Sequence, residues 1–225
     1  MSPLTKKALL GCVQTVSLAA ATIFIAAWSI AFWEAWLYLL VFSGTTVLVT
    51  LYFLKHDPNL VERRLNAGPR VETERNQKII MTFAIGLMVA LWAIPGFDHR
   101  WHWSSMPASL VLVADLLVVL GILLVVYVFK ENSYAAGTVQ VEKDQLVIST
   151  GPYAWIRHPM YAACFLYVIG TPLALGSIVG LIPALLLYAV IILRLLDEER
   201  YLARNLSGYE AYRQKVRYRL VPKIW

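Results

Sequence analysis

Two charged stretches of this chain could together bind a small charged molecule. Arg157-His158-Pro159 opens one apolar run, and Asp197–Glu199 closes a later one. Proline suits the first position of a helix, so we expect His158 at the helix start. The unpaired backbone N–H groups there carry partial positive charge, to which Arg157 adds a full charge. The chemistry predicted for this stretch is binding of an anion, a carboxylate or a phosphate.

The acidic stretch has the complementary charge. Three acids gathered at the end of one helix repel one another and oppose the helix dipole. Pairing with a nearby arginine such as Arg194 offsets this by only about 0.3–0.5 kcal/mol for an exposed pair. A cationic ligand therefore explains the acids better than local pairing does.

The elements that position these stretches are long apolar blocks. The chain is 59% hydrophobic and 15% charged, whereas a soluble domain carries roughly 25% charged residues. A helix that crosses a bilayer needs about 20 apolar residues. Blocks near that length are Leu9–Ala31, Trp36–Leu54, Ile79–Phe97, Ala108–Phe129, Tyr161–Leu175 and Ile178–Leu196. They predict an all-α integral membrane protein with about six transmembrane helices, the first of them too long for a cleaved signal peptide.

The last two blocks are separated only by Gly176-Ser177, which predicts a tight helical hairpin. At 1.5 Å per residue, arms of roughly 25 and 30 Å return Glu198 to the level of His158. A positive and a negative wall would then face each other at the membrane surface. A zwitterion with a carboxylate and an ammonium group fits such walls, and S-adenosylmethionine carries both beside its sulfonium.

The charges of the loops predict the orientation. With six spans, nineteen of the twenty Lys and Arg residues fall on one side, and only Arg100 lies opposite. The positive-inside rule makes the basic side cytoplasmic, so both termini and the site are expected there. The net charge of +6 then reflects topology and contact with anionic lipid headgroups. Nucleic acid is not an expected partner.

The simplest division of the chain has two parts of one compact domain. Residues 1–129 are predicted to hold transmembrane helices one to four. Residues 130–225 are predicted to hold a cytoplasmic segment, the hairpin and a C-terminal cytoplasmic cap. At the junction, Lys130–Asn132 either line the pocket or cap the preceding helix. "GTVQVEKDQLVIST" alternates like a short strand pair around Lys143-Asp144.

Other polar or reactive residues have structural interpretations. His99 and His102 lie among tryptophans, which favours an interfacial aromatic belt over a metal site, so no metal is predicted. Cys12 and Cys164 are interpreted as small buried hydrophobes without a disulfide. Asp115 lies inside the fourth apolar block, nearer its outer end, and is expected to bond a hydroxyl group or water within the bundle.

Several motifs together resemble one enzyme family. "GPYAWIRHPMY", a short hairpin, "DEE" and "GYEAYRQKVRYRLVPKIW" resemble the isoprenylcysteine carboxyl methyltransferase family and the related membrane phospholipid methyltransferases. The resemblance covers about residues 130–225 and depends on the combination of motifs. It implies a pocket for S-adenosylmethionine between the hairpin and the C-terminal tail.

The resemblance also implies roles for individual residues. Those assigned to cofactor binding are Tyr153, Arg157, His158, Tyr161, Glu198 and Glu199. Tyr212 and Arg217 are assigned to the catalytic end of the pocket, where they would close it or hold an acceptor carboxylate. Adjacent helical residues point about 100° apart, so one glutamate should face the ligand, and Glu198 is preferred for the ammonium group.

The implied activity is transfer of a methyl group to a lipophilic acceptor by in-line displacement. A carboxylate acceptor needs no general base, whereas an amine or thiol must lose a proton, and no residue stands out as that base. The alternatives are a phospholipid N-methyltransferase or a small-thiol S-methyltransferase. More distant ones are an NADPH-dependent enzyme like the sterol reductases and a non-catalytic membrane protein. Pro159 and the Glu198-Glu199 pair favour the methyltransferase, while the acceptor and the oligomeric state stay open.

Overall fold

The computed structural model describes residues 1–72, 74–135, 137–142 and 144–225, and within them it is helical without a strand. The α-helices are α1 (Pro3–Ala27), α2 (Trp33–His56), α3 (Pro58–Leu65), α4 (Arg75–Trp101), α5 (Ala108–Glu131), α6 (Pro159–Ala174), α7 (Leu181–Asn205) and α8 (Tyr209–Lys215). One 3-10 helix, η1, covers Gly151–Ala154.

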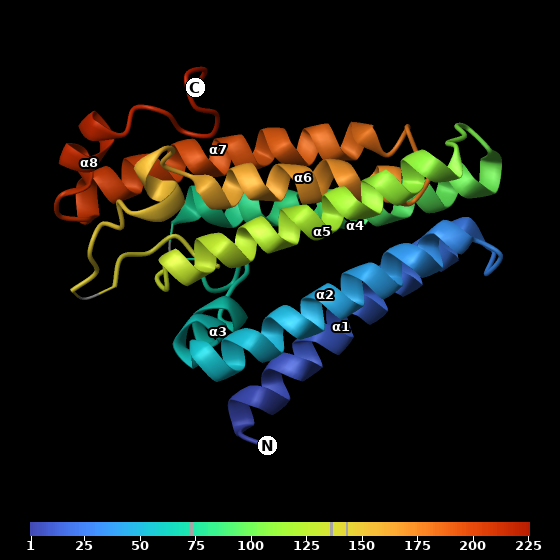
Figure 1. Cartoon of the computed structure of the whole chain (residues 1–225), viewed down its shortest axis with the longest axis horizontal. Coiled ribbons are helices and arrows are strands. Elements are labelled where there is room, and N and C mark those ends of the chain that lie inside the picture. Colours follow the sequence, from blue (N-terminus) through green and yellow to red (C-terminus); the bar gives the residue numbers. More distant parts are fainter. Residues whose placement is uncertain (73, 136, 143) are drawn as a thin grey trace.

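The long helices run between the two ends of an elongated bundle (Figure 1). α1 packs on α2 and α4, α4 packs on α7, and α5 lies along α6. One end of the bundle gathers α3, α8, residues 132–135, 137–142 and 144–158, and the C-terminal tail, and we call it the polar end (Figure 1). The opposite end has shorter connections between the long helices.

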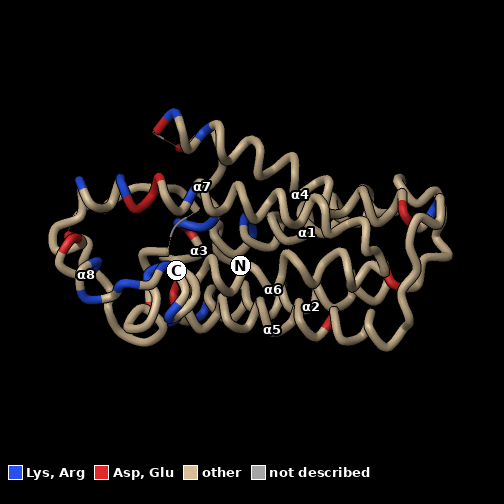
Figure 2. Tube along the Cα trace, turned by 90° about the horizontal axis from the view of Figure 1, so that it is seen from above, with Lys and Arg blue, Asp and Glu red and all other residues tan. Residues whose placement is uncertain are grey.

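Lys and Arg residues are concentrated at the polar end (Figure 2). This is the distribution that the loop charges predicted, and it places the basic residues where chain segments leave the bundle. The cytoplasmic location of this end stays a prediction.

Four helices are long and apolar enough to cross a membrane: α1, α2, α4 and α5. These helices support an integral membrane protein. α6 is shorter, with 16 residues, and the last third of α7 is charged, so the count of six spans stays a prediction. α6 and α7 pack together, but their connection is wider than the predicted two residues because α7 begins only at Leu181. Gly176 provides the left-handed turn in it, with φ of 70°.

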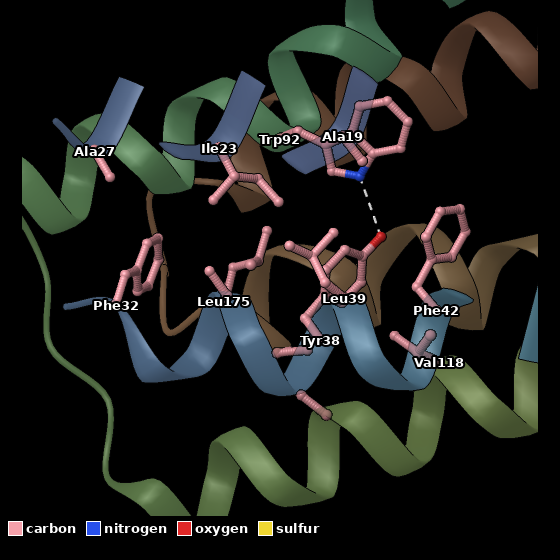
Figure 3. Close-up of a cluster of buried hydrophobic side chains, with 13 residues drawn as sticks. Ala19, Ile23, Ala27, Phe32, Tyr38, Leu39, Phe42, Trp92, Val118 and Leu175 are labelled. Carbon is pink, nitrogen blue, oxygen red and sulfur yellow. Dashed lines mark hydrogen bonds between the residues drawn. The ribbon is translucent and has the colours of Figure 1, made fainter. Parts of the chain in front are cut away.

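The helices interlock through small and aromatic residues (Figure 3). Trp92 Nε1 donates a hydrogen bond of 3.1 Å to Tyr38 Oη in the core, so two polar groups are paired away from water. On α5, Gly121 lies so close to α6 that a Cβ atom there would be 2.7 Å from the backbone nitrogen of Tyr167. Small residues let membrane helices approach closely, and here they fix α5 against α6.

The predicted strand pair is wrong for the described residues, since 137–142 and 144–150 contain no strand. Lys143 lies outside the described residues. The alternating pattern has another cause. Val139 is buried, and Val141 and Val147 pack against the apolar side chains of α8 and its neighbours. One side of this segment thus packs on the cap without forming a β-ladder.

Four other residues that the sequence analysis considered lie within the long helices: His99, Asp115, Cys12 and Cys164. His99 stacks on Phe32 with ring centroids 4.0 Å apart. The expected hydroxyl partner of Asp115 is not present, because neither of its buried carboxylate oxygens has a hydrogen-bond partner within the described residues. Cys12 and Cys164 are both free, and Cys12 Sγ lies 3.3 Å from Thr50 Oγ1.

Candidate active site

A polar cavity lies at the polar end, between the start of α6, the end of α7, α8 and the segment that follows α5. The space between its walls, its opening included, is about 860 Å³. The predicted site residues that line it are Tyr153, Arg157, His158, Tyr161, Glu198 and Tyr212. Glu199 and Arg217 do not line it. The hairpin and the tail are thus brought together around one space.

The start of α6 is held in place by the C-terminal tail. His158 is the N-cap residue and Pro159 the first helical residue, as the sequence predicted. The backbone N–H groups of Arg157 and His158 donate hydrogen bonds of 2.9 and 3.0 Å to the carbonyls of Tyr218 and Arg219. The tail therefore fixes the direction from which the chain enters this helix.

Glu199 is the centre of a buried ionic network. Its Oε1 accepts hydrogen bonds from Arg157 Nε at 2.6 Å and from His158 Nε2 at 3.2 Å, and its Oε2 accepts one from Arg219 Nε at 2.9 Å. Burial alone would raise the pKa of Glu199, but the hydrogen bonds from His158, Arg157 and Arg219 outweigh it and lower the pKa. Glu199 is therefore an ionised carboxylate that joins α7 to the start of α6 and to the tail.

This network differs from the predicted arrangement, in which a positive and a negative wall face each other across a ligand. Arg157 Nη1 also donates to the carbonyls of Val216 and Arg217, at 2.7 and 2.8 Å, so three partners in the protein surround its guanidinium. Arg157 and Glu199 are thus bonded to each other and do not face each other across the cavity, which Arg157 lines and Glu199 does not. The assignment of both residues to the cofactor stays a prediction.

Glu198 is the acid that faces the cavity. It is half-buried, and its Oε2 accepts a 2.6 Å hydrogen bond from Tyr161 Oη, one turn inside α6. Adjacent positions on α7 thus have different surroundings. Glu199 binds the protein's own cations, whereas Glu198 presents a carboxylate to the cavity.

Two hydroxyl groups in the cavity wall have no hydrogen-bond partner among the residues that the structure describes. Tyr209 Oη and Thr138 Oγ1 are buried and make no hydrogen bond within the described residues. Nearly all buried polar groups in folded proteins are paired, and leaving one unpaired costs about 1–3 kcal/mol. A polar ligand in the cavity would supply the missing partners. Sequence reasoning missed both residues, although Tyr209 stands one turn before Tyr212 in the same "GYEAY" motif.

Arg194 is a third cavity residue that the sequence did not reveal. Its guanidinium donates to Glu72 Oε1 at 2.8 Å, to Gln77 Oε1 at 2.9 Å and to the Gly137 carbonyl at 3.0 Å. Glu72 precedes α4, Gln77 lies in the first turn of α4, and Gly137 follows α5. The local pairing with Glu198 that the spacing suggested is replaced by contacts from distant segments.

The tyrosines of the cavity are hydrogen-bond donors at neutral pH. Tyr212 Oη donates to the Tyr153 carbonyl at 2.8 Å, and Tyr153 Oη accepts from Asn132 Nδ2 at 3.0 Å. Burial raises the pKa of Tyr153 to about 12, and burial together with nearby negative charge raises the pKa of Tyr209. None of these hydroxyls is ionised at neutral pH.

Other predicted residues contribute less to the cavity. The side chain of Arg217 is exposed, and the residue contributes its carbonyl to Arg157. Within Lys130–Asn132 both predicted roles fall on Asn132, which lines the cavity and is the C-cap residue of α5. Lys130 Nζ lies 4.8 Å from the centroid of the Tyr52 ring, and Glu131 accepts a hydrogen bond from Thr150.

Comparison with known proteins finds a family whose members are similar to this part of the chain. Residues 110–208 match the phospholipid methyltransferase family. The match to phospholipid methyltransferases begins in α5 and ends just before α8, so it includes Arg157, His158, Tyr161 and Glu198. Tyr209 and Tyr212 follow it directly.

Two curated proteins of this kind are similar in sequence. A protein-S-isoprenylcysteine O-methyltransferase of Schizosaccharomyces pombe is 40% identical over 76 residues, which are 33% of this chain and 32% of the relative. One of Saccharomyces cerevisiae is 33% identical over 117 residues, 47% of this chain and 49% of the relative. The matches span a third to a half of these relatives' length. They confirm the resemblance inferred from the motifs.

Proposed function

We propose that this protein is a membrane-embedded methyltransferase that transfers the methyl group of S-adenosylmethionine to a lipophilic acceptor. The observation that carries the proposal is the polar cavity, which combines Glu198, the start of α6 and two hydroxyl groups without a partner among the described residues. Most of its lining lies within residues 110–208, which match the phospholipid methyltransferase family. The named activity of the two yeast relatives supports the same conclusion.

The residues of the cavity fit the groups of such a cofactor. We assign its ammonium group to Glu198, whose carboxylate Tyr161 orients. Its carboxylate suits the first turn of α6, which follows His158, because the helix dipole favours an anion there. Tyr209 Oη and Thr138 Oγ1 are free to pair with its remaining polar groups.

Two residues that the sequence assigned to the cofactor have a supporting role in this proposal. Arg157 and Glu199 bind each other, and by doing so they fix His158 and the tail at the cavity. The proposal uses Tyr212 to hold Tyr153 and does not use the exposed side chain of Arg217.

S-adenosylmethionine would supply an electrophilic methyl group, so the protein's task is to hold, align and desolvate the reacting groups. The tyrosine hydroxyls are too weakly acidic to be ionised, and the Glu199 carboxylate is already bonded to Arg157, His158 and Arg219. A carboxylate acceptor, which needs no base, suits this site better than an amine or a thiol.

A phospholipid N-methyltransferase is the second candidate, because the matching family carries that name. An ammonium headgroup would have to lose a proton before it attacks the methyl group. The acceptor assay described below separates this candidate from the first.

In the proposed arrangement, residues 1–129 form the membrane scaffold and 130–225 the catalytic core. The polar end and both termini face the cytoplasm, since nearly all basic residues gather there (Figure 2). The cofactor would enter from water, while a lipophilic acceptor would enter from the bilayer.

The proposal is tested by methyl transfer from methyl-labelled S-adenosylmethionine to a panel of acceptors. The panel contains N-acetyl-S-farnesylcysteine, phosphatidylethanolamine and a short alkyl thiol. We expect label in the methyl ester of the farnesylcysteine. Label in phosphatidylethanolamine alone would favour the second candidate, and binding of NADPH without transfer to any acceptor would contradict the methyltransferase function.

A further inference from the structure

The C-terminal tail, residues 216–225, has a buried side and an exposed side. Leu220 is buried and packs with Tyr161 and Leu195, so the middle of the tail belongs to the hydrophobic core at the end of α7. Val221 and Ile224 are apolar as well, but they are 46% and 80% exposed. A short segment that is anchored on one side and exposes apolar side chains on the other has the form of a docking surface.

The contact of Leu220 fixes the depth of the tail along the bundle. Its partner Leu195 lies in the last apolar turn of α7, and the acidic stretch Asp197–Glu199 follows. Leu193, half a turn earlier, is 57% exposed, as expected for a side chain that faces lipid. Figure 1 shows the C-terminus on the flank of α7, whereas α8 lies farther out at the tip of the polar end. The tail therefore lies where the apolar part of α7 ends, which in the proposed membrane arrangement is the level of the bilayer surface.

The charged side chains of the tail are all positive. Its sequence, VRYRLVPKIW, contains Arg217, Arg219 and Lys223 and no acid. Arg219 is bonded to Glu199, whereas the exposed side chains of Arg217 and Lys223 form no ion pair with a residue that the structure describes. Basic side chains attract anionic headgroups, and apolar side chains beside them can enter the boundary of the acyl chains. The charge and the level of this surface thus both fit anionic phospholipid.

Two exposed aromatic rings lie beside these residues. Tyr218 belongs to the tail and is 36% exposed. Trp155 is 72% exposed and lies two residues before Arg157, whose backbone N–H donates a 2.9 Å hydrogen bond to the Tyr218 carbonyl. Trp and Tyr side chains are enriched at the interface between membrane and water. The tail and the segment before α6 therefore have the composition of an interfacial element.

We infer that the C-terminal tail binds anionic phospholipid at the membrane surface, and that this binding strengthens the cofactor site. Val221 and Ile224 enter the boundary of the acyl chains, and Arg217 and Lys223 contact the phosphates of the headgroups. The second part of the inference rests on the proposed function, because it makes the lipid a regulator of that same site.

Three contacts connect the tail to the polar cavity. The carbonyls of Tyr218 and Arg219 accept hydrogen bonds of 2.9 and 3.0 Å from the backbone N–H groups of the two residues before Pro159. Arg219 Nε also donates to Glu199 Oε2 at 2.9 Å. The second of the two residues is His158, which lines the cavity. A lipid that binds only the docked tail increases the fraction of molecules in which this wall is formed, so the cofactor binds more tightly.

The first measurement is hydrogen exchange of the whole protein in lipid nanodiscs. One set of discs contains phosphatidylcholine alone, and the other contains phosphatidylcholine mixed with phosphatidylglycerol. The amides of Arg157 and His158 donate to the tail, so we expect them to exchange about fivefold more slowly in the mixed discs, the effect of one basic residue at an anionic surface. The double variant Arg217→Gln, Lys223→Gln should remove this difference. Soluble glycerol phosphate added to the neutral discs should not reproduce it.

Matched variants separate the tail from general effects of charge and exposure. Lys6→Gln, Lys7→Gln removes two exposed charges at the start of α1, which packs on α3 at the same end of the bundle, and should keep the lipid dependence. Ile224→Asp should weaken it, because a negative charge is then placed against the headgroups. Ile30 is 77% exposed in the connection between α1 and α2, at the opposite end, so Ile30→Asp should leave the lipid dependence unchanged.

The second measurement is the affinity for S-adenosylhomocysteine in the same two sets of discs. We expect the wild type to bind it about fivefold more tightly in the mixed discs, because the lipid and the cofactor favour the same docked tail. The double variant Arg217→Gln, Lys223→Gln should bind it equally in both.

The outcomes separate this inference from the proposed function. Equal exchange rates in the two sets of discs, or a lipid effect that persists in the double variant, overturns the inference even if methyl transfer occurs. Lipid-dependent exchange together with an equal affinity for S-adenosylhomocysteine in both sets overturns the regulation of the cofactor site. Lipid-dependent exchange that requires Arg217 and Lys223, in a protein that does not bind S-adenosylhomocysteine, supports the lipid contact and contradicts the proposed function alone.

Discussion

Arg157 Nε and Glu199 Oε1 are 2.6 Å apart, and both side chains are only 4% exposed. The two residues come from the start of α6 and the end of α7, and with His158 and Arg219 they join the hairpin to the tail. The cavity depends on this junction because its walls come from the same elements. The family resemblance implied that both residues bind the cofactor, whereas in the structure the two side chains bind each other.

Breaking this pair should destabilise the polar end strongly. Removing one partner of a buried ion pair leaves an uncompensated charge and costs about 3–5 kcal/mol. We expect Arg157→Met to lower the thermal unfolding midpoint more than the double variant Arg157→Met, Glu199→Met does. The midpoint in detergent measures this, with Arg213→Met in the exposed pair to Glu210 as the control. If Arg157→Met unfolds at the wild-type temperature, the pair of Arg157 and Glu199 does not stabilise the polar end.

The Glu199 network should also make stability depend on pH in the acid range. The pKa of Glu199 is lowered in the folded protein from an ordinary value of 4.5. Its contribution is therefore complete above about pH 4.5 and is lost as the pH falls through the lower folded-state pKa. The difference in unfolding midpoint between the wild type and Glu199→Gln should be constant from pH 7 to 5 and shrink below pH 4.5. A difference that grows toward acid pH would contradict the assignment.

Tyr209 and Tyr212 should respond in opposite ways to loss of their hydroxyl groups. Tyr209 Oη is buried and has no hydrogen-bond partner in the described part of the chain, so Tyr209→Phe should leave the stability of the ligand-free protein unchanged or raise it slightly. It should weaken binding of S-adenosylhomocysteine by about fivefold or more, since that hydroxyl is assigned to the ligand. Unfolding midpoints and titration calorimetry provide the two measurements.

The matched variant is Tyr212→Phe. Its hydroxyl is bonded to the Tyr153 carbonyl, so its loss should destabilise the ligand-free protein by about 1 kcal/mol. If Tyr209→Phe is the more destabilising of the two variants and does not affect ligand binding, the cavity assignment is wrong at this position.

Arg63 of α3 should control access to the polar cavity. Arg63 Nε and Nη2 donate to the two oxygens of Glu142 at 2.5 and 2.9 Å, and Nη1 donates to the Ser133 carbonyl at 3.0 Å. Glu142 and Ser133 belong to the segment that supplies Tyr134 and Thr138 to the cavity wall. Glu142→Gln should therefore weaken the contact that holds this segment against α3, and S-adenosylhomocysteine should dissociate several-fold faster.

The control for this effect is a charge exchange. Because the pair is partly exposed, its loss should change overall stability by no more than about 1 kcal/mol. The double variant Arg63→Glu, Glu142→Arg should restore a slow dissociation rate in stopped-flow measurements. A rate that stays fast in the exchanged pair would show that the contact does not act through charge.

Sequence patterns predicted the apolar helices and the helix start at Pro159, because hydropathy and proline geometry are local properties. They also predicted that the hairpin returns Glu198 to the level of His158, and Glu198 does accept a hydrogen bond from Tyr161 in the first turn of α6. They did not predict the partners of Arg194, because Glu72 and Gln77 come from a distant loop and helix start. The strand prediction failed because valines that alternate along the chain pack on α8 instead of on a second strand.

The sequence also could not predict an apolar cavity that is bounded by α1, α2, α3, α5 and α6. It lies between helices that are apolar on most sides, so hydropathy does not distinguish a residue facing the cavity from one facing lipid. Val49 and Leu48 have similar side chains, and only the packing of α2 against α5 separates their roles.

Glu198 tests the central claim most directly, through the affinity for S-adenosylhomocysteine measured by titration calorimetry. Glu198→Gln keeps the shape of the side chain and the contact with Tyr161, but removes the charge assigned to the ammonium group. Glu210→Gln makes the same change at an exposed position of α8. We predict that Glu198→Gln weakens binding at least about tenfold and that Glu210→Gln leaves it unchanged. Equal affinity in the wild type and Glu198→Gln would contradict the assignment of this cavity to the methyl donor.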